Sequence, residues 1–186
     1  MTRSTDWSVA RPCWCPMPDR VTSAGDRANA LADSGSRVLP TVADTEQFGR
    51  EIAATLSAGD LVILDGPLGA GKTALTRGIA AGLDVRGRVS SPTFIIAREH
   101  RAQNPGGPNL IHVDAYRLGG LDELDALDLD SDLTDSVVVV EWGAGVVERL
   151  VERHLLVRLR RDASDDDVAD GGTDADETRV VEWGWQ

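Results

Sequence analysis

A single lysine stands in a glycine-rich motif whose residue types suit the binding of phosphate. The chain has eighteen arginines but only one lysine, Lys72, within the sequence GPLGAGKT at residues 66–73. In the Walker A pattern G-x-x-x-x-G-K-[ST], backbone N–H groups surround nucleotide phosphates and the lysine reaches the β- and γ-phosphates. An ammonium group is compact, whereas a planar guanidinium is too wide to fit beneath such a loop. We therefore predict a nucleotide-binding loop here.

The sequence on both sides of the motif predicts the strand and the helix that such a loop requires. Residues 61–64 are four consecutive apolar residues, which is typical of a buried strand. Leu75, Ile79 and Leu83 recur every four residues and form one apolar stripe on a helix. The N-terminus of that helix adds its partial positive charge to the phosphate site. The order of strand, loop and helix argues against a chance match.

Two residues are predicted to hold Mg²⁺ beside the phosphates. Thr73 ends the motif, and its hydroxyl is the usual first ligand. The second ligand is usually an acid at the end of a hydrophobic strand. Glu141 follows the valines at 137–140, a run that predicts a central parallel strand, and it fits this Walker B role. A strand-end acid that caps a neighbouring helix is the other interpretation of Glu141. Asp65 is the alternative acid, although it leads directly into the loop.

The segment around His112 carries further polar candidates. Residues 110–116 alternate, so His112, Asp114 and Tyr116 should lie on one face of a strand. If that face turns toward the phosphates, Asp114 can orient the attacking water or hold a metal-bound water. A polar strand face with an ordinary hydrogen-bonded histidine fits the spacing equally well. Thr93 is either a switch residue that senses the γ-phosphate through Mg²⁺ or part of a plain turn.

Composition restricts the class of protein. The chain has 186 residues, 41% of them hydrophobic, and a net charge of −12, which fits one domain with a sizeable core. No apolar run approaches the ~20 residues of a membrane span. The N-terminus lacks the apolar core of a secretory signal, so we expect a cytoplasmic protein. The negative charge argues against nucleic-acid binding through a broad basic face, and a role in an RNA pathway would need a protein partner.

Several segments fall outside the motif region. Residues 122–135 predict a helix with an acidic outer side, which is either a solvated face or a docking site for a basic partner. Residues 1–37 and the acidic insert at 162–177 are predicted to be disordered. Cys13 and Cys15 have no further ligand nearby and are expected to be free thiols.

The predicted elements combine into an α/β fold, a P-loop NTPase three-layer fold, over residues 38–186. Its central sheet is expected to be mostly parallel. Residues 155–159 and 178–183 predict two antiparallel C-terminal strands, and residues 94–97 predict a strand that is half of a hairpin.

The beginning of this domain is predicted from shorter patterns. The first strand is expected to begin at Val38, so that a chain lacking residues 1–36 should keep its activity. Asp44 and Gln47 fit an N-cap pair at the start of the first helix. Gly59 is expected to close that helix.

These motifs together resemble the TsaE (YjeE) family, the small bacterial P-loop ATPases of tRNA threonylcarbamoyladenosine synthesis. The resemblance covers residues 38–161 and is far more specific than any one motif. It rests, in order, on GPLGAGKT, Thr76-Arg77-Gly78, Ser91-Pro92-Thr93-Phe94, the run from His112 to Leu118, and Glu141-Trp142. The chain departs from the family at Pro67, where an acid is usual, and we expect this change to affect ATP binding little.

The resemblance implies an ATPase that requires Mg²⁺ and acts with the TsaD and TsaB proteins. Those proteins place a threonylcarbamoyl group on adenosine 37 of tRNAs that read codons beginning with A. TsaD would carry the transferase site, and tRNA would be contacted only indirectly. No membrane would be involved.

The resemblance also implies roles for single residues. Catalytic roles would fall to Lys72, Asp114, Glu141 and Thr93. Thr73 and Glu141 would hold Mg²⁺. The phosphates would be held by Gly69, Ala70, Gly71, Lys72, Thr73 and Ala74. Residues 39–45 would help hold the adenine. Trp142 lies beside the site and either stacks on a partner or base or packs in the interior.

Three other functions are alternatives to an ATPase. A GTPase needs an Asn-Lys-x-Asp element, which the chain lacks because Lys72 is its only lysine. A small-molecule P-loop kinase needs a lid of arginines, for which Arg98, Arg101 and Arg117 are the candidates. A nucleotide-sensing scaffold would bind ATP without turnover. Since the sequence shows no arginine finger in cis, intrinsic hydrolysis should be slow.

Overall fold

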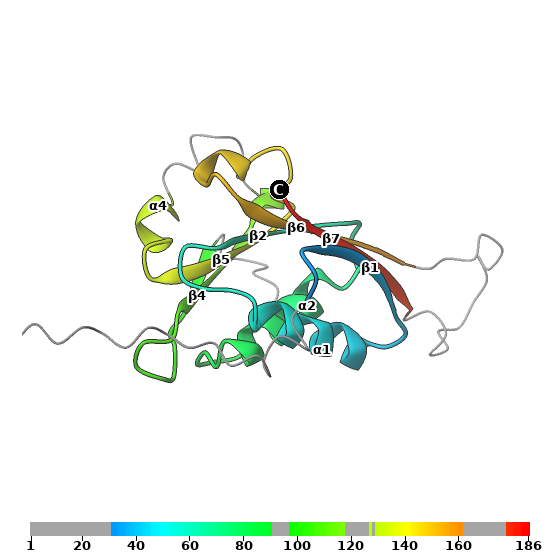
Figure 1. Ribbon diagram of the computed structural model, residues 1–186, viewed down its shortest axis with the longest axis horizontal. Coiled ribbons are helices and arrows are strands. Elements are labelled where there is room, and N and C mark those ends of the chain that lie inside the picture. Colours follow the sequence, from blue (N-terminus) through cyan, green and yellow to red (C-terminus); the bar gives the residue numbers. More distant parts are fainter. Residues whose placement is uncertain (1–30, 91–96, 118–126, 128, 162–177) are drawn as a thin grey trace, which may run out of the picture.

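The computed structural model describes residues 31–90, 97–117, 127, 129–161 and 178–186. Within these residues, seven strands form one sheet, with helices on both of its faces (Figure 1). The elements, with η for 3₁₀ helices, are β1 Ser34–Leu39, α1 Val42–Ala53, β2 Leu61–Asp65, α2 Lys72–Gly82, β3 Ala97–His100, β4 Asn109–Asp114, η2 Ala115–Arg117, α4 Leu129–Asp132, β5 Ser136–Glu141, η3 Glu148–Leu150, β6 His154–Arg161 and β7 Arg179–Trp185. None of these helices is long and apolar enough to cross a membrane.

The sheet has a parallel centre and antiparallel edges. Its strand order is β1-β7-β6-β2-β5-β4-β3. The neighbours β6, β2, β5 and β4 run parallel, while β1, β7 and β3 pair antiparallel with their neighbours. This confirms the predicted mostly parallel sheet and its antiparallel C-terminal strands. The carboxyl ends of β2, β4 and β5 therefore meet at one edge, which is where ligands bind in sheets of this kind.

The predicted hairpin is also present, as the antiparallel pair β3 and β4. The described part of the strand is Ala97–His100, and residues 94–96 of the predicted strand lie outside the described residues. The prediction of an acidic helix over 122–135 falls partly outside them too, at residues 122–126 and 128. The described part of that segment holds α4, and β5 begins directly after it at Ser136.

The two faces of the sheet have separate apolar cores. Val137 and Val139 of β5 pack with residues of α1 and α2, whereas Val138 and Val140 pack with Leu129 and its neighbours on the other face. All four valines are fully buried, as expected of a central parallel strand. Figure 1 shows α1 and α2 on one side of the sheet and the short helix α4 on the other. Within the described residues, the elements on that second face, α4 and η3, are short.

The domain begins earlier than predicted. β1 starts at Ser34, and its register with β7 runs from Ser34–Gly184 to Leu39–Arg179. The boundary at residue 37 is therefore wrong, and removal of residues 1–36 would cut into this strand. This strand has no clear sequence pattern, because five of its six residues are exposed and show no apolar alternation. For residues 1–30, including Cys13 and Cys15, and for 162–177, the predictions stay predictions.

The first helix also has different ends from those predicted. Thr41 is the N-cap, and its hydroxyl accepts from the Asp44 backbone N–H at 3.1 Å. Asp44 Oδ2 accepts from the Thr41 N–H at 3.1 Å, so Asp44 completes a capping box instead of starting the helix. The helix ends at Ala53, well before Gly59, whose N–H donates to Ser136 at the start of β5.

Glycines allow α1 and α2 to pack closely, and this contact sets the direction of α2. A Cβ on Gly78 would overlap the backbone carbonyl of Glu46, and one on Gly49 would overlap the carbonyl of Leu75. An ion pair between Arg77 and Glu46, at 2.8 Å, joins the same two helices. Since α2 begins at the phosphate-binding loop, the helix contact also positions that loop.

We expect Gly78→Ala to destabilise the fold by about 1–3 kcal/mol. The added methyl group would overlap the backbone of Glu46, which cannot move aside as a flexible side chain can. Chemical denaturation measures this loss. Gly184→Ala is the matched control, since the nearest atom to its added Cβ is 3.5 Å away. Equal stabilities for the two variants would contradict the importance of the contact.

Candidate nucleotide-binding site

The GPLGAGKT loop connects β2 to α2, the order that the sequence predicted. Gly66 and Gly71 have φ angles of 142° and 103°, a region that favours glycine. Gly71 is the N-cap of α2 and forms no side-chain cap, so the first N–H groups of the helix stay available to a ligand. The loop therefore presents backbone donors where an anion would sit.

Lys72 is held inside the loop. Only 4% of it is exposed, and its Nζ donates to the carbonyl oxygens of Gly66 at 2.6 Å and Pro67 at 3.0 Å. The ring of Trp142 lies 3.7 Å from the same Nζ atom. Burial lowers the pKa of Lys72, while the nearby carboxylates of Glu141 and Asp114 act in the opposite direction. Two of the three ammonium protons are thus used by the loop, which fixes the group in position.

Trp142 is a pocket residue with an unusual backbone. Its φ is +63°, which is uncommon for a non-glycine residue. Its ring covers Lys72 and packs on Tyr116 at 5.3 Å between centroids. Trp142 therefore lines the cavity and does not pack in the interior. Its stacking on a partner or base stays a prediction.

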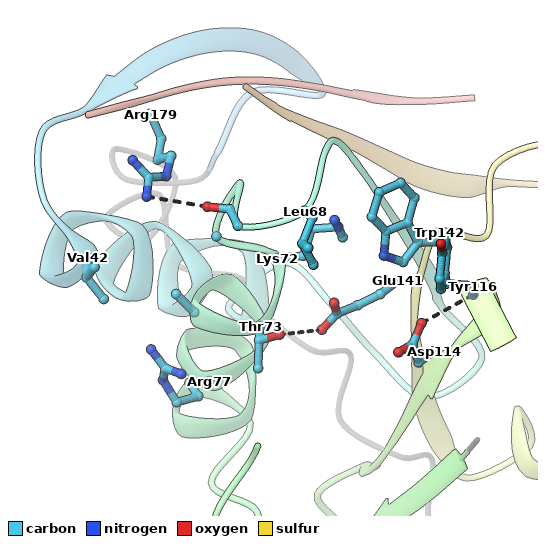
Figure 2. Close-up of a pocket in the computed structure, with 13 residues that line it drawn as sticks. Val42, Leu68, Lys72, Thr73, Arg77, Asp114, Tyr116, Glu141, Trp142 and Arg179 are labelled. Carbon is cyan, nitrogen blue, oxygen red and sulfur yellow. Dashed lines mark hydrogen bonds between the residues drawn. The ribbon is translucent and has the colours of Figure 1, made fainter. Parts of the chain in front are cut away.

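Glu141 and Thr73 meet at the N-terminus of α2 (Figure 2). The Thr73 hydroxyl donates to Glu141 Oε1 at 2.9 Å, and the carboxylate is almost fully buried. Asp114 is the register partner of Glu141 in the neighbouring strand β4. The carboxyl ends of two parallel strands thus bring both acids to the phosphate-binding loop.

The donor atoms here fit Mg²⁺. This ion prefers oxygen ligands, and it is usually held by one or two carboxylates together with waters and substrate phosphates. The hydroxyl of Thr73 and the carboxylates of Glu141 and Asp114 supply such oxygens beside the loop. The described residues contain no cluster of three or more His, Cys, Asp or Glu that could hold a metal ion.

His112 supports the Glu141 carboxylate. Its Nε2 lies 2.9 Å from the Glu141 Oε1 atom that Thr73 also contacts, and its side chain is 1% exposed. Nδ1 is buried and has no hydrogen-bond partner among the residues that the structure describes. With the proton on Nε2, the ring donates to the carboxylate and restricts its rotation. The structure thus shows His112 as a buried, hydrogen-bonded histidine of β4 whose partner is the Glu141 carboxylate.

The predicted alternation ends at Asp114, where β4 ends. Tyr116 lies in the turn η2, and its backbone N–H donates to Asp114 Oδ1 at 3.2 Å. The tyrosine is 74% exposed at the rim of the pocket. The prediction that Tyr116 shares a strand face with His112 is therefore wrong, because the chain turns to hold the Asp114 carboxylate.

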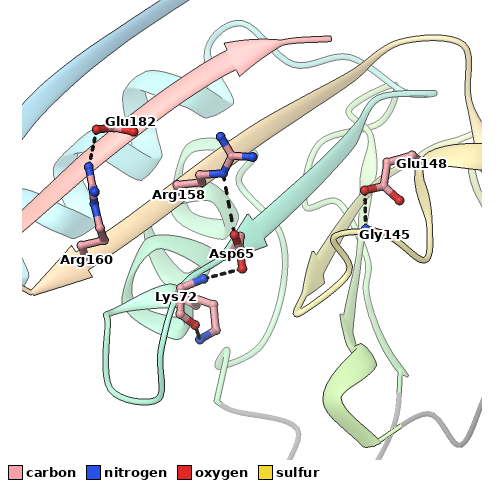
Figure 3. A network of polar contacts seen from close by, with 8 residues as sticks. Asp65, Lys72, Gly145, Glu148, Arg158, Arg160 and Glu182 are labelled. Carbon is pink, nitrogen blue, oxygen red and sulfur yellow. Dashed lines mark hydrogen bonds and ion pairs between the residues drawn. The ribbon is translucent and has the colours of Figure 1, made fainter.

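Asp65, the other candidate Walker B acid, faces elsewhere. Its Oδ1 accepts from the Gly66 N–H at 2.9 Å, and its Oδ2 lies 3.8 Å from Arg158 Nε on β6 (Figure 3). Asp65 thus holds Gly66, the first residue of the loop. Glu141, and not Asp65, is the acid that Thr73 contacts.

A cavity of about 540 Å³ joins these groups. It is lined by Val42, Leu68, Gly69, Gly71, Lys72, Thr73, Ala74, Arg77, Asp114, Tyr116, Glu141, Trp142 and Arg179. Of the residues implied to hold phosphate, Ala70 alone is absent from the lining, and it is fully buried. Thr93 lies outside the described residues. Val42 belongs to the segment implied to hold adenine.

Two arginines that line the cavity were not predicted as site residues from the sequence. Arg77 and Arg179 line the cavity, whereas the suggested lid residues Arg98 and Arg101 do not. The side chain of Arg117, the third suggested residue, is outside what the structure describes. Arg77 could have been found, because it lies one helical turn after Thr73 on α2. No sequence signal connects Arg179 to the loop, since the two are separated by more than a hundred residues.

The comparisons with known proteins agree with this geometry. A family model described as "Threonylcarbamoyl adenosine biosynthesis protein TsaE" matches residues 39–169. The chain belongs to the TsaE family. A relative from Mycobacterium bovis, named tRNA threonylcarbamoyladenosine biosynthesis protein TsaE, is 50% identical over 161 residues, which cover 83% of this chain and 89% of the relative. One of the same name from Streptomyces coelicolor is 61% identical over 125 residues, 67% of this chain and 82% of that one.

The fold is also similar to a solved structure. The crystal structure of Bacillus subtilis YdiB matches with a TM-score of 0.57 and 29% identity, and the match covers 81% of this chain and 84% of that one. The P-loop fold predicted from the sequence is thus confirmed.

Proposed function

We propose that this protein is a Mg²⁺-dependent ATPase of tRNA threonylcarbamoyladenosine biosynthesis. The observation that supports ATP hydrolysis is the convergence of Lys72, Thr73 and Glu141 at the N-terminus of α2. The membership of the TsaE family and the names of the relatives support the pathway. The cytoplasm is the proposed location.

Each group has a distinct role in this proposal. The backbone N–H groups of residues 69–74 bind the phosphates, and the Lys72 ammonium contributes its positive charge to the same site. Thr73 and Glu141 hold Mg²⁺, with His112 fixing the carboxylate. The ion, when bound, neutralises negative charge on the phosphate oxygens. Asp114, with one oxygen held by the Tyr116 N–H, orients the attacking water through the other.

The partners in this proposal are the TsaD and TsaB proteins, and tRNA is contacted only through them. The net charge of −12 disfavours direct contact with a polyanion. Leu68, at the outer arc of the loop, is 87% exposed and stands with Tyr116 at the mouth of the pocket. Two exposed apolar side chains at the entrance fit a site that a protein partner covers.

Two other functions remain as outcomes of the test. A kinase would phosphorylate a small acceptor, but Arg98 and Arg101, two of the three suggested lid arginines, do not line the cavity. A scaffold would bind ATP tightly without turnover.

Phosphate release by the purified protein, alone and with the TsaD and TsaB proteins of the same cell, tests the proposal. We expect slow release alone and at least about tenfold faster release with the partners, because catalytic groups supplied in trans raise NTPase rates 10³–10⁵-fold. A phosphorylated product instead of free phosphate would indicate a kinase. Tight ATP binding with no turnover in either case would indicate a scaffold.

A further inference from the structure

Arg179 lies at the end of the cavity opposite the carboxylates. It is the first residue of β7 and the register partner of Arg161 on β6. Its residue exposure is only 9%, although it lines the cavity. Figure 2 shows the guanidinium pointing at the phosphate-binding loop, on the side of Lys72 away from Glu141.

The guanidinium borders the turn at which α2 begins. Its Nη2 donates to the Gly69 carbonyl at 3.4 Å, and its Nη1 donates to the Thr178 carbonyl at 3.2 Å. Its Nε lies 3.7 Å from the position that a Cβ on Gly71, the N-cap of α2, would take. These hydrogen bonds are long and their acceptors are neutral. A phosphate oxygen is a stronger acceptor, and a guanidinium binds phosphate in a bidentate manner.

The positions of the other groups give the nucleotide a direction in the cavity. Thr73 and Glu141 mark the end where the terminal phosphates lie, because they are the Mg²⁺ ligands of the proposed function. Val42 and Arg179 mark the opposite end. A nucleotide that extends between these ends places its ribose-proximal phosphate beside Arg179.

We infer that Arg179 binds the α-phosphate of the nucleotide and contributes equally to ADP and ATP binding. This inference rests on the proposed function, since it requires the cavity to hold a nucleotide. Arg161 also reaches the Gly69 carbonyl, with its Nε at 3.3 Å, but it is exposed and does not line the cavity. The contact is therefore assigned to Arg179.

Isothermal titration of ADP and of ATP into wild-type protein and Arg179→Gln tests the inference. Because a hydrogen bond to a charged group contributes roughly tenfold to a hundredfold in affinity, we expect both Kd values to rise by about 10- to 100-fold. Arg179→Lys, which keeps the charge, should recover part of this loss. Arg160→Gln is the matched control, because Arg160 is an exposed β6 residue that pairs with Glu182 and does not line the cavity. Its Kd values should change by less than about twofold.

The outcomes separate this inference from the proposed function. If wild-type protein binds neither ADP nor ATP, the proposed function fails. If wild-type protein binds both and Arg179→Gln binds them equally well, the inference alone is overturned. A loss for ATP but not ADP also overturns it, because the guanidinium would then contact the γ-phosphate.

A second measurement uses the wild-type fold, in case Arg179→Gln is unstable. The arginine Nε–H signals of ¹⁵N-labelled protein are recorded, and Arg179→Lys assigns the Arg179 signal by its disappearance. We expect this signal to shift on addition of ADP and to stay in place on addition of adenosine, which has no phosphate. If the Arg179 signal does not shift on addition of ADP, or shifts equally on addition of adenosine, the inferred contact with phosphate is overturned.

Discussion

Lys72→Ala is expected to abolish measurable ATP binding. The substitution removes the buried ammonium group and leaves the carbonyls of Gly66 and Pro67 without their donor. Since a hydrogen bond to a charged group is worth about 1.5–3 kcal/mol and two phosphates are contacted, affinity should fall by at least about 100-fold. Titration calorimetry with ATP measures the loss.

Two further variants separate the charge of Lys72 from its shape. Lys72→Arg keeps the charge, yet it should bind ATP almost as poorly, because a planar guanidinium does not fit under the loop. Arg50→Ala removes an exposed cation of α1 that hydrogen-bonds Gln47, and it should leave the Kd unchanged. Normal ATP binding by Lys72→Ala with an intact fold would remove the basis of the proposed function.

Glu141→Gln is expected to bind nucleotide but to lose Mg²⁺-dependent hydrolysis. The amide oxygen can still accept from Thr73 and His112, so the local structure should be kept. It lacks the negative charge that holds a divalent cation. Because metal ions contribute several kcal/mol to such transition states, the rate should fall by at least about 100-fold.

The Mg²⁺ dependence of ATP affinity provides a readout that does not depend on turnover. Wild-type protein should bind ATP more tightly when Mg²⁺ is added, and Glu141→Gln should show no such gain. Asp65→Asn is the matched control, because it makes the same chemical change in the rival Walker B acid. If Asp65→Asn loses the Mg²⁺ effect while Glu141→Gln keeps it, the assignment of the two acids must be exchanged.

The sequence predicted those parts of the fold that depend on short segments. The four apolar residues before the loop, the glycines within it and the stripe of Leu75 and Ile79 specify strand, turn and helix locally. The valine run of β5 predicted a central strand because only a strand covered on both faces tolerates apolar side chains in both directions. Its last position, Glu141, could then be placed beside Thr73.

The start of the domain was predicted less well. β1 is an edge strand held by β7, a partner far along the chain, and its own residues are mostly exposed. Without a buried face, it has no apolar alternation to detect. The N-cap pair was similarly predicted one turn too late, at Asp44 and Gln47 instead of Thr41 and Asp44, because several polar residues in succession can each serve as an N-cap.

By itself the sequence determined the phosphate-binding loop and the order of the elements around it, since both are written in neighbouring residues. Only the tertiary structure decided that His112 supports Glu141, that Asp65 faces β6, and that Arg179 reaches the loop from β7. These contacts depend on which strands pair and in which register. Such pairing is a property of the whole sheet, and no short pattern along the chain encodes it.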